Sequence, residues 1–267
     1  MTKPNAFEPW SGLVPFEDTK LFVKDTGGSG IPILYLNGQF ANQSYWKRVI
    51  AELGSGYRHI TFDERARGKK SGKSSDYSFE SCVRDVDAVR SARGVKKCIV
   101  VGWSYGAFVA AHWASRNPGS CLGAVLVDGA QPYDWLTEDI KERIRRLFKL
   151  LNPLMWLLRP TGLTPRLSAT QMGEINIELG KIAREKELGP VLDRIIAPTR
   201  YVLASGVSFG SKGAEQEQIR TGVNPVVERN QNIKISAKVP SNHGAILKND
   251  FRAVASAILE IINLIKS

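Results

Sequence analysis

The sequence predicts an α/β fold in which one mainly parallel sheet carries helices on both faces and an inserted helical segment. Three observations predict this fold. Apolar runs alternate with amphipathic stretches along most of the chain, residues 130–196 contain helical patterns only, and 267 residues with 43% hydrophobic composition suit one large globular domain. Strand–helix alternation favours a parallel sheet, because each connection between parallel strands has to cross the sheet.

The expected strands are short apolar runs bounded by polar or turn residues. Continuous runs such as 31–36 and 98–102 indicate strands that are buried on both faces. The predicted strands cover residues 21–24, 31–36, 57–62, 98–102, 122–127, 199–204 and 233–239.

The expected helices show apolar residues at helical spacing and end near glycine or proline, as Gly94 and Pro118 illustrate. The predicted helices cover residues 42–53, 79–93, 107–116, 137–151, 154–158, 170–186, 214–221 and 250–265. We therefore expect a core domain of residues 1–129 and 197–267, and a helical cap of residues 130–196 that lies over one end of the sheet.

The strongest motif is Gly102-Trp103-Ser104-Tyr105-Gly106, which ends a predicted strand and opens a predicted helix. This is the context that the G-x-S-x-G nucleophile turn requires. The turn is so sharp that glycine is needed at both ends to relieve crowding. Ser104 would project above the sheet at a helix N-terminus, which favours the negative charge that develops in acyl transfer. Ser104 is therefore the candidate nucleophile.

The candidate general base is His243, in the segment Ser241-Asn242-His243-Gly244. This segment follows the last predicted strand, so it belongs to a loop at the strand carboxyl ends, where ligands bind. The other histidines are His59, which opens a strand, and His112, which lies within a helix. We expect both of these to be structural.

The candidate oxyanion hole combines the segment Asn37-Gly38-Gln39-Phe40 with the residue after Ser104. A serine acyl-transfer site needs two N–H donors for the oxyanion. The backbone N–H groups of Gln39 and Tyr105 are the natural pair, and Gly38 would let the loop pass close to the substrate. An ordinary strand-to-helix turn remains the alternative for this segment.

These motifs, in this order, resemble the α/β-hydrolase superfamily from about residue 20 to 265. Residues 63–68, Asp-Glu-Arg-Ala-Arg-Gly, are similar to the D-x-R-G-x-G-x-S segment of the family, with a displaced glycine. Asn37-Gly38-Gln39 is similar to its H-G-x oxyanion loop, with Asn37 in place of a histidine that is not catalytic. The resemblance implies a mostly parallel eight-stranded sheet, with a helical cap inserted after the sixth strand.

The triad acid departs from the commonest pattern of the family. Most members carry it after the seventh strand, but residues 205–210 contain no carboxylate. A minority, including haloalkane dehalogenases and fungal zearalenone lactonases, take the acid from the end of the sixth strand, where Asp128 lies. We predict Asp128 as the acid. Glu215 and Glu217 remain alternatives, as does a structural role for Asp128 in capping the next turn.

The predicted activity is hydrolysis of a carboxylic ester or lactone of a fairly hydrophobic small molecule. A serine nucleophile argues against dehalogenase or epoxide-hydrolase chemistry, because those relatives use aspartate. The predicted substrate contacts are Phe40, Trp103, Trp135, Met155 and Trp156. Two alternatives stay open: a carbon–carbon bond hydrolase or hydroxynitrile-lyase-type enzyme on the same triad, and a non-enzymatic small-molecule binder on this fold.

Composition limits cofactors and partners. The net charge is +11, but the basic residues are scattered and form no nucleic-acid-binding motif. Residues 67–74 nearly match a phosphate-binding loop, except that Gly68 comes one place late. Without clustered Cys or His, we predict no metal and no cofactor. Three separated cysteines, Cys82, Cys98 and Cys121, fit reduced thiols, so we expect a cytoplasmic protein.

No apolar stretch reaches the roughly 18–20 residues of a spanning helix, so we expect a soluble chain without stable membrane insertion. The basic stretch 141–149 and the apolar residues 155–158 that follow it could contact a membrane or form a homodimer through the cap. Packing of the cap onto the core is the favoured interpretation of this segment.

Overall fold

The computed structural model, which describes residues 8–162, 164–207 and 213–267, contains one eight-stranded sheet in the order β1-β2-β4-β3-β5-β6-β7-β8. The strands are β1 (Trp10–Phe16), β2 (Thr19–Asp25), β3 (Pro32–Leu36), β4 (Arg58–Asp63), β5 (Cys98–Trp103), β6 (Cys121–Val127), β7 (Thr199–Ala204) and β8 (Ile233–Val239). Strand β2 runs antiparallel to β1 and β4, while the pairs from β4 through β8 are parallel. The predicted fold class is confirmed.

The strand order reverses around β3, which lies between β4 and β5. After β3 the chain forms β4 on one side of β3, and from β5 onward each new strand is added on the other side. Such a reversal separates the loops that follow the two neighbouring strands and leaves a crevice at their carboxyl ends. The segments after β3 and β5, which contain the predicted oxyanion loop and Ser104, therefore meet at this crevice.

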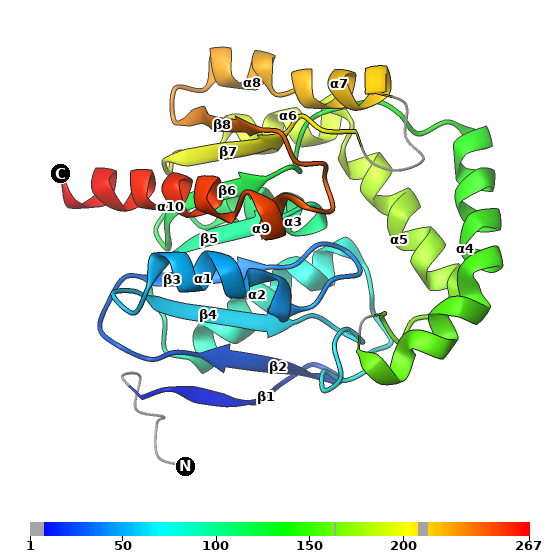
Figure 1. The fold of residues 1–267 in the computed structure, drawn as a ribbon, viewed down its shortest axis with the longest axis horizontal. Helices are drawn as coiled ribbons and strands as arrows, with labels where there is room; N and C mark the ends of the chain where they lie inside the picture. The colour runs from blue at the N-terminus through cyan, green and yellow to red at the C-terminus, as the bar shows by residue number, and fades with distance from the viewer. Residues whose placement is uncertain (1–7, 163, 208–212) are drawn as a thin grey trace.

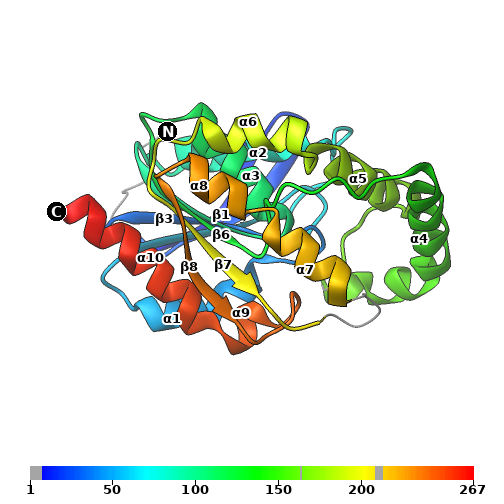
Figure 2. The ribbon, with the colours of Figure 1, turned by 90° about the horizontal axis from the view of Figure 1, so that it is seen from above.

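Two helical layers cover the sheet (Figure 2). Helices α1 (Lys47–Leu53), α9 (Ile246–Asn249) and α10 (Phe251–Lys266) lie on one face, and α2 (Phe79–Ala92), α3 (Tyr105–Arg116) and α6 (Glu185–Asp193) lie on the other. The strand β3 shows why its sequence is apolar throughout. Leu34 and Leu36 enter the hydrophobic cluster on one face, and Ile33 and Tyr35 enter the cluster on the other.

The helical segment between β6 and β7 contains α4 (Glu138–Leu158), the short 3₁₀ helix η2 (Arg159–Thr161), α5 (Ala169–Ile182) and α6. Figure 1 shows α4 and α5 standing beyond one end of the sheet, whereas α6 packs on α3. We propose that α4, η2 and α5 form the cap. The predicted boundaries of the cap, residues 130–196, also contain α6, which lies on the sheet beside α3. The helices predicted at 137–151 and 154–158 are one helix, because the exposed Pro153 lies on the solvent side, where water can reach the carbonyl group that loses its partner.

The remaining helices are the 3₁₀ helix η1 (Gln43–Trp46), which leads into α1, and two helices between β7 and β8: α7 (Gly213–Thr221) and α8 (Asn224–Arg229). Within the part of the chain that the structure describes, no helix is long and apolar enough to cross a membrane.

Candidate active site

Ser104 lies on a strained turn between β5 and α3, with φ 56° and ψ −119°. A residue other than glycine rarely adopts positive φ, and such strain is concentrated at functional sites. The two flanking glycines make the turn possible. A Cβ atom on Gly102 would overlap the carbonyl oxygen of Gly106, and a Cβ atom on Gly106 would overlap the carbonyl oxygens of Leu36 and Asn37. The glycine spacing is therefore a steric requirement of this turn.

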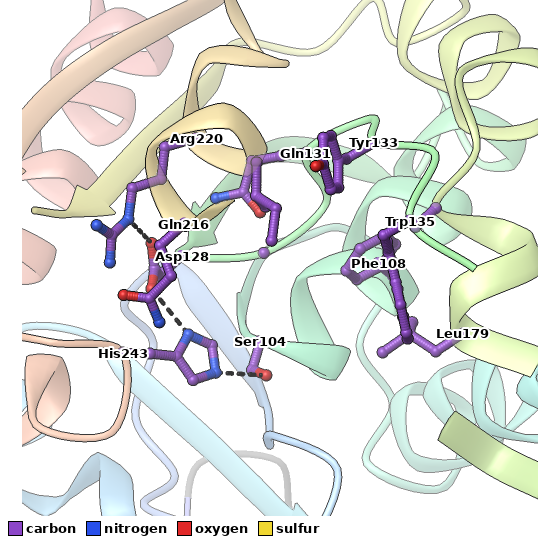
Figure 3. Close-up of a pocket in the computed structure, with 13 residues that line it drawn as sticks. Ser104, Phe108, Asp128, Gln131, Tyr133, Trp135, Leu179, Gln216, Arg220 and His243 are labelled. Carbon is purple, nitrogen blue, oxygen red and sulfur yellow. Dashed lines mark hydrogen bonds and ion pairs between the residues drawn. The ribbon is translucent and has the colours of Figure 1, made fainter. Parts of the chain in front are cut away.

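His243 connects Ser104 to Asp128 (Figure 3). Its Nε2 atom lies 2.9 Å from Ser104 Oγ, and its Nδ1 atom lies 2.8 Å from Asp128 Oδ2. With the proton on Nδ1, the imidazole donates to the carboxylate and offers Nε2 as the acceptor of the serine proton. The side chain of His243 is 38% exposed, whereas that of Asp128 is 5% exposed. The structure thus brings together the three residues predicted as a triad.

Asp128 follows β6 and has a positive φ of 42°. Its Oδ1 atom accepts a hydrogen bond of 3.0 Å from the backbone N–H of Ala204, at the end of the neighbouring strand β7. The two carboxylate oxygens therefore have different hydrogen-bond partners. Oδ1 is held by the sheet, and Oδ2 is left free to orient His243.

A cation that the sequence did not point to lies beside this carboxylate. The Nε atom of Arg220, on α7, is 3.8 Å from Asp128 Oδ1, and both side chains are less than a tenth exposed. Arg220 also donates a hydrogen bond of 2.8 Å from Nη2 to the carbonyl oxygen of Gly206. The chain after β7, where most members of the family carry the triad acid, here contributes a positive charge to the acid from β6.

The two alternative acids lie on the same helix, α7. Glu217 is exposed, and the side chain of Glu215 lies outside the described residues. The carboxylate that contacts His243 is that of Asp128.

Trp103 contacts both the backbone and the ring of His243. Its indole Nε1–H donates a hydrogen bond of 3.2 Å to the carbonyl oxygen of His243, and the two rings lie 5.6 Å apart. The ring of Tyr45 stacks on the indole ring of Trp103, with the two centroids 5.5 Å apart. Trp103, predicted as a substrate contact, thus holds the loop that carries the base.

The predicted oxyanion loop lies directly against Ser104, the predicted nucleophile. A Cβ atom on Gly38 would lie 2.9 Å from the Trp103 ring and 3.5 Å from Ser104 Cβ, so glycine allows this close approach. The N–H of Tyr105 belongs to the first turn of α3, where N–H groups have no partner inside the helix.

Asn37 fixes the start of this loop. Its Nδ2 atom donates to the carbonyl oxygen of Phe62 at 2.7 Å and to Glu64 Oε2 at 2.9 Å, and its Oδ1 accepts from Trp46 Nε1 at 3.0 Å. Burial raises the pKa of the Glu64 carboxyl group. At position 37, where the family usually has histidine, asparagine thus joins the loop to β4 and η1.

Arg67 fixes the next part of the loop. Its buried guanidinium donates from Nε to the carbonyl oxygen of Gln39 at 2.6 Å and from Nη1 to the carbonyl oxygen of Arg65 at 3.1 Å. Arg67 thereby fixes the carbonyl group of Gln39. The position of the loop after an apolar strand is visible in the sequence, whereas no sequence pattern points to Arg67 as its support.

A cavity of about 240 Å³ opens beside Ser104. It is lined by Ser104, Phe108, Asp128, Gly129, Gln131, Tyr133, Trp135, Leu179, Ala183, Gln216, Ile219, Arg220 and His243. Figure 3 shows Phe108, Trp135 and Leu179 grouped on the side away from Arg220. This volume lies below the roughly 300–1,000 Å³ of pockets for drug-sized ligands.

The predicted substrate contacts are distributed over several places. Trp135 lines the cavity, whereas Phe40 packs edge-on against Phe148, with ring centroids 5.5 Å apart. Met155 is partly buried against the hydrophobic cluster on the α2–α3 face, and Trp156 is 65% exposed on α4. Among these predicted contacts, Trp135 is the one in the wall of the cavity.

No group of three or more His, Cys, Asp or Glu residues within the described ranges could hold a metal ion. The three cysteines are free and buried.

Comparisons with known proteins agree with this architecture. The family profile described as "alpha/beta hydrolase fold" matches residues 31–156. A haloalkane dehalogenase from Mesorhizobium japonicum is 28% identical over 153 residues, which is 56% of this chain and 49% of that protein. A non-heme chloroperoxidase from Streptomyces lividans is 30% identical over 125 residues, 45% of each chain. The matched regions therefore span about half the length of these curated relatives.

Among solved structures, a thermophilic esterase from Thermogutta terrifontis superposes with a TM-score of 0.71 at 18% identity. The match covers 97% of this chain and 100% of that one. A haloalkane dehalogenase from Agrobacterium tumefaciens gives a TM-score of 0.70 at 18% identity, over 96% and 97% of the two chains. The protein has the α/β-hydrolase fold, and the model of that family matches residues 31–156 of the chain.

Proposed function

We propose that the protein is a serine hydrolase that cleaves a carboxylic ester or lactone of a fairly hydrophobic small molecule. The observation that carries this proposal is the hydrogen-bonded chain from Ser104 through His243 to Asp128, with contacts of 2.9 and 2.8 Å. These distances lie within the range expected of a nucleophile, its base and the group that orients the base.

In the proposed mechanism, His243 Nε2 removes the proton of Ser104 as Oγ attacks the substrate carbonyl carbon. The backbone N–H groups of Gln39 and Tyr105 stabilise the oxyanion. The tetrahedral intermediate collapses when His243 donates its proton to the leaving oxygen, which leaves an acyl group on Ser104. His243 then activates water to release the acid, while Asp128 stabilises the imidazolium form at each step.

The cavity supports an apolar substrate of modest size. Phe108, Trp135 and Leu179 give it an apolar wall, and its volume is about 240 Å³. A position of the acid after β6 favours lactone cleavage by analogy with the lactonases that share it, which is an argument from family resemblance alone. A serine at position 104 argues against the aspartate-based chemistry of the dehalogenases.

Replacement of Ser104 tests the proposal. Ser104→Ala removes one hydroxyl group from a turn whose shape depends on glycines, so the variant should fold and lose a factor of about 10⁴ or more in kcat. The matched control is Ser236→Ala, whose exposed hydroxyl contacts Glu260 away from the site.

The assay follows p-nitrophenyl esters and a panel of lactones, with a pre-steady-state burst of phenol as the sign of an acyl-enzyme. Mass spectrometry after treatment with a fluorophosphonate should place the label on Ser104. A folded Ser104→Ala variant that keeps more than about a tenth of the parent rate would refute the mechanism. Labelling of Ser104 without turnover of any ester or lactone would favour the binder or the carbon–carbon bond hydrolase.

A further inference from the structure

Helix α4 carries two apolar rows, and only one of them packs inside the protein. The inner row includes Ile144, Phe148 and Met155, which contact the hydrophobic cluster on the α2–α3 face. The outer row consists of Leu147, Leu150, Leu154 and Leu157, which are 49%, 77%, 55% and 67% exposed. Packing of the cap onto the core explains the inner row and leaves the outer row without a partner.

The outer row forms a continuous ridge. Its leucines are spaced by three, four and three residues, which places them on one side of a helix. Trp156, 65% exposed, is a further exposed apolar side chain of α4. Contiguous exposed apolar side chains on a soluble protein mark a contact surface.

Three cations stand at the amino-terminal end of the ridge and along its flank. Arg143, Arg146 and Lys149 are exposed and make no ion pair with any residue that the structure describes. The neighbouring cations on the same helix behave differently, since Lys141 pairs with Glu138 at 2.5 Å and Arg145 with Glu142 and Glu174 at 2.9 Å. The cations on the outward side therefore have their charge available for an anionic partner.

The position of α4 suits a flat partner. In both ribbon views α4 is the outermost element at its end of the molecule, with the sheet behind it (Figures 1 and 2). A planar surface can therefore approach the outward side of α4 without first meeting the core.

We propose that the outward side of α4 binds the surface of an anionic lipid bilayer. The leucine ridge would enter the boundary between headgroups and acyl chains, and Arg143, Arg146 and Lys149 would contact lipid phosphates. Reversible membrane binding of useful strength takes two signals, an apolar insertion and a basic patch, and α4 supplies both. The helix is already folded in the protein, so binding does not require it to order.

A second copy of the chain fits this surface less well. The four leucines are 49–77% exposed, and together they present less surface than the roughly 800 Å² per partner that a stable protein interface buries. A two-fold pair of such ridges would also bring two sets of unpaired cations into one contact. Binding to a bilayer does not require a second protein surface of complementary shape, and anionic lipids supply the charge opposite to that of the three cations.

The test is flotation of the purified chain with vesicles of phosphatidylcholine alone and of phosphatidylcholine mixed with phosphatidylglycerol. We expect binding to the mixed vesicles that weakens at high salt, and little binding to phosphatidylcholine. Leu150→Gln/Leu157→Gln should lower the affinity at least tenfold. Arg143→Gln/Arg146→Gln/Lys149→Gln should lower it by about 100-fold, since each cation near such a surface contributes about fivefold.

Matched controls test whether the effect is specific to α4. Leu264→Gln removes a 49% exposed leucine from α10, and Lys234→Gln/Lys238→Gln removes exposed cations from the edge strand β8. Both controls should bind as the parent does. All variants should keep the parent circular dichroism spectrum and the parent rate on a soluble ester, because none of these residues lines the cavity.

Three results would overturn the proposal. The first is equal flotation of the parent and the Leu150→Gln/Leu157→Gln variant, and the second is no flotation of either. The third is a dimer in light scattering that the leucine variant converts to a monomer while vesicles fail to bind, which would assign the ridge to a second copy of the chain.

Discussion

Arg220 offers the sharpest test of how the site is held together. The change is Arg220→Gln, which removes the positive charge beside Asp128 and leaves a shorter, uncharged polar side chain. Its guanidinium Nε atom lies 3.8 Å from Asp128 Oδ1, with side-chain exposures of 9% and 5%. We expect both the free energy of unfolding and kcat to fall.

The size of the effect follows from the geometry. Opposite unit charges at this separation attract by about 4 kcal/mol at an effective dielectric constant near 20. Removal of one partner from a buried pair costs about 3–5 kcal/mol, because the remaining charge is left buried without compensation. The expected loss in the free energy of unfolding is therefore about 3–5 kcal/mol. A displaced Asp128 would also misorient His243, and misplacement of a catalytic group by about 1 Å can lower the rate by about 100-fold.

The assay combines urea unfolding with steady-state kinetics on a soluble ester. Arg229→Gln is the matched control, since Arg229 pairs with Glu185 and Asp193 on the surface and is 34% exposed. It should cost less than about 1 kcal/mol. Arg220→Lys should recover part of both losses, because it restores the charge without the planar donor. If Arg220→Gln unfolds within about 1 kcal/mol of the parent and keeps its kcat, the reasoning from this contact is wrong.

Asp128→Asn should keep the fold and lower kcat by as much as about 10⁴, because the amide favours the wrong imidazole tautomer, whereas Glu217→Gln should stay within about threefold in steady-state kinetics. Trp135→Ala should change the ranking of esters with different acyl groups in competition assays, and Trp156→Ala should not, because Trp156 is 65% exposed. Burial, with help from the nearby positive charge of Arg116, lowers the pKa of His112 to about 4 from the ordinary value of 6.5. The unfolded chain then binds a proton that the folded chain does not, so the parent should lose about 3 kcal/mol as pH falls from about 6.5 to 4. Urea unfolding across this pH range should show a flatter dependence for His112→Gln.

Each of these expectations has a contrary result. A nearly active Asp128→Asn variant would contradict the first, and an unchanged ester ranking for Trp135→Ala would contradict the second. Parallel curves of unfolding free energy against pH for His112→Gln and the parent would contradict the third.

Local sequence was sufficient for the central strands and the nucleophile turn. Strand β3 is apolar throughout because its side chains enter hydrophobic clusters on both faces of the sheet. The glycines at 102 and 106 are required by contacts within a few residues of Ser104 and with the end of β3. Where the physical constraint is local, or repeats along the element, the sequence pattern predicts the structure.

Strand β1 and the long-range side-chain contacts were not predictable in this way. Strand β1 contains Gly12 and Pro15, residues that argue against a strand. It forms because it lies at the edge and pairs with β2 alone, so the missing N–H of Pro15 does not interrupt a second ladder. The contacts of Arg220 with Asp128 and of Arg67 with Gln39 join segments far apart in the chain. No local spacing identifies such pairs before the sheet order is known.

The distance along the chain between the reacting groups has a consequence for biosynthesis. Ser104 precedes its base by 139 residues, and Asp128 precedes it by 115 residues. His243 reaches them only after β8 has joined the edge of the sheet, so a nascent chain that has folded its first six strands carries a serine without a base. A fluorophosphonate probe would therefore label Ser104 slowly until the last strand is in place. The rate of labelling during translation would therefore report when β8 joins the sheet, and would not respond to the earlier folding of the first six strands.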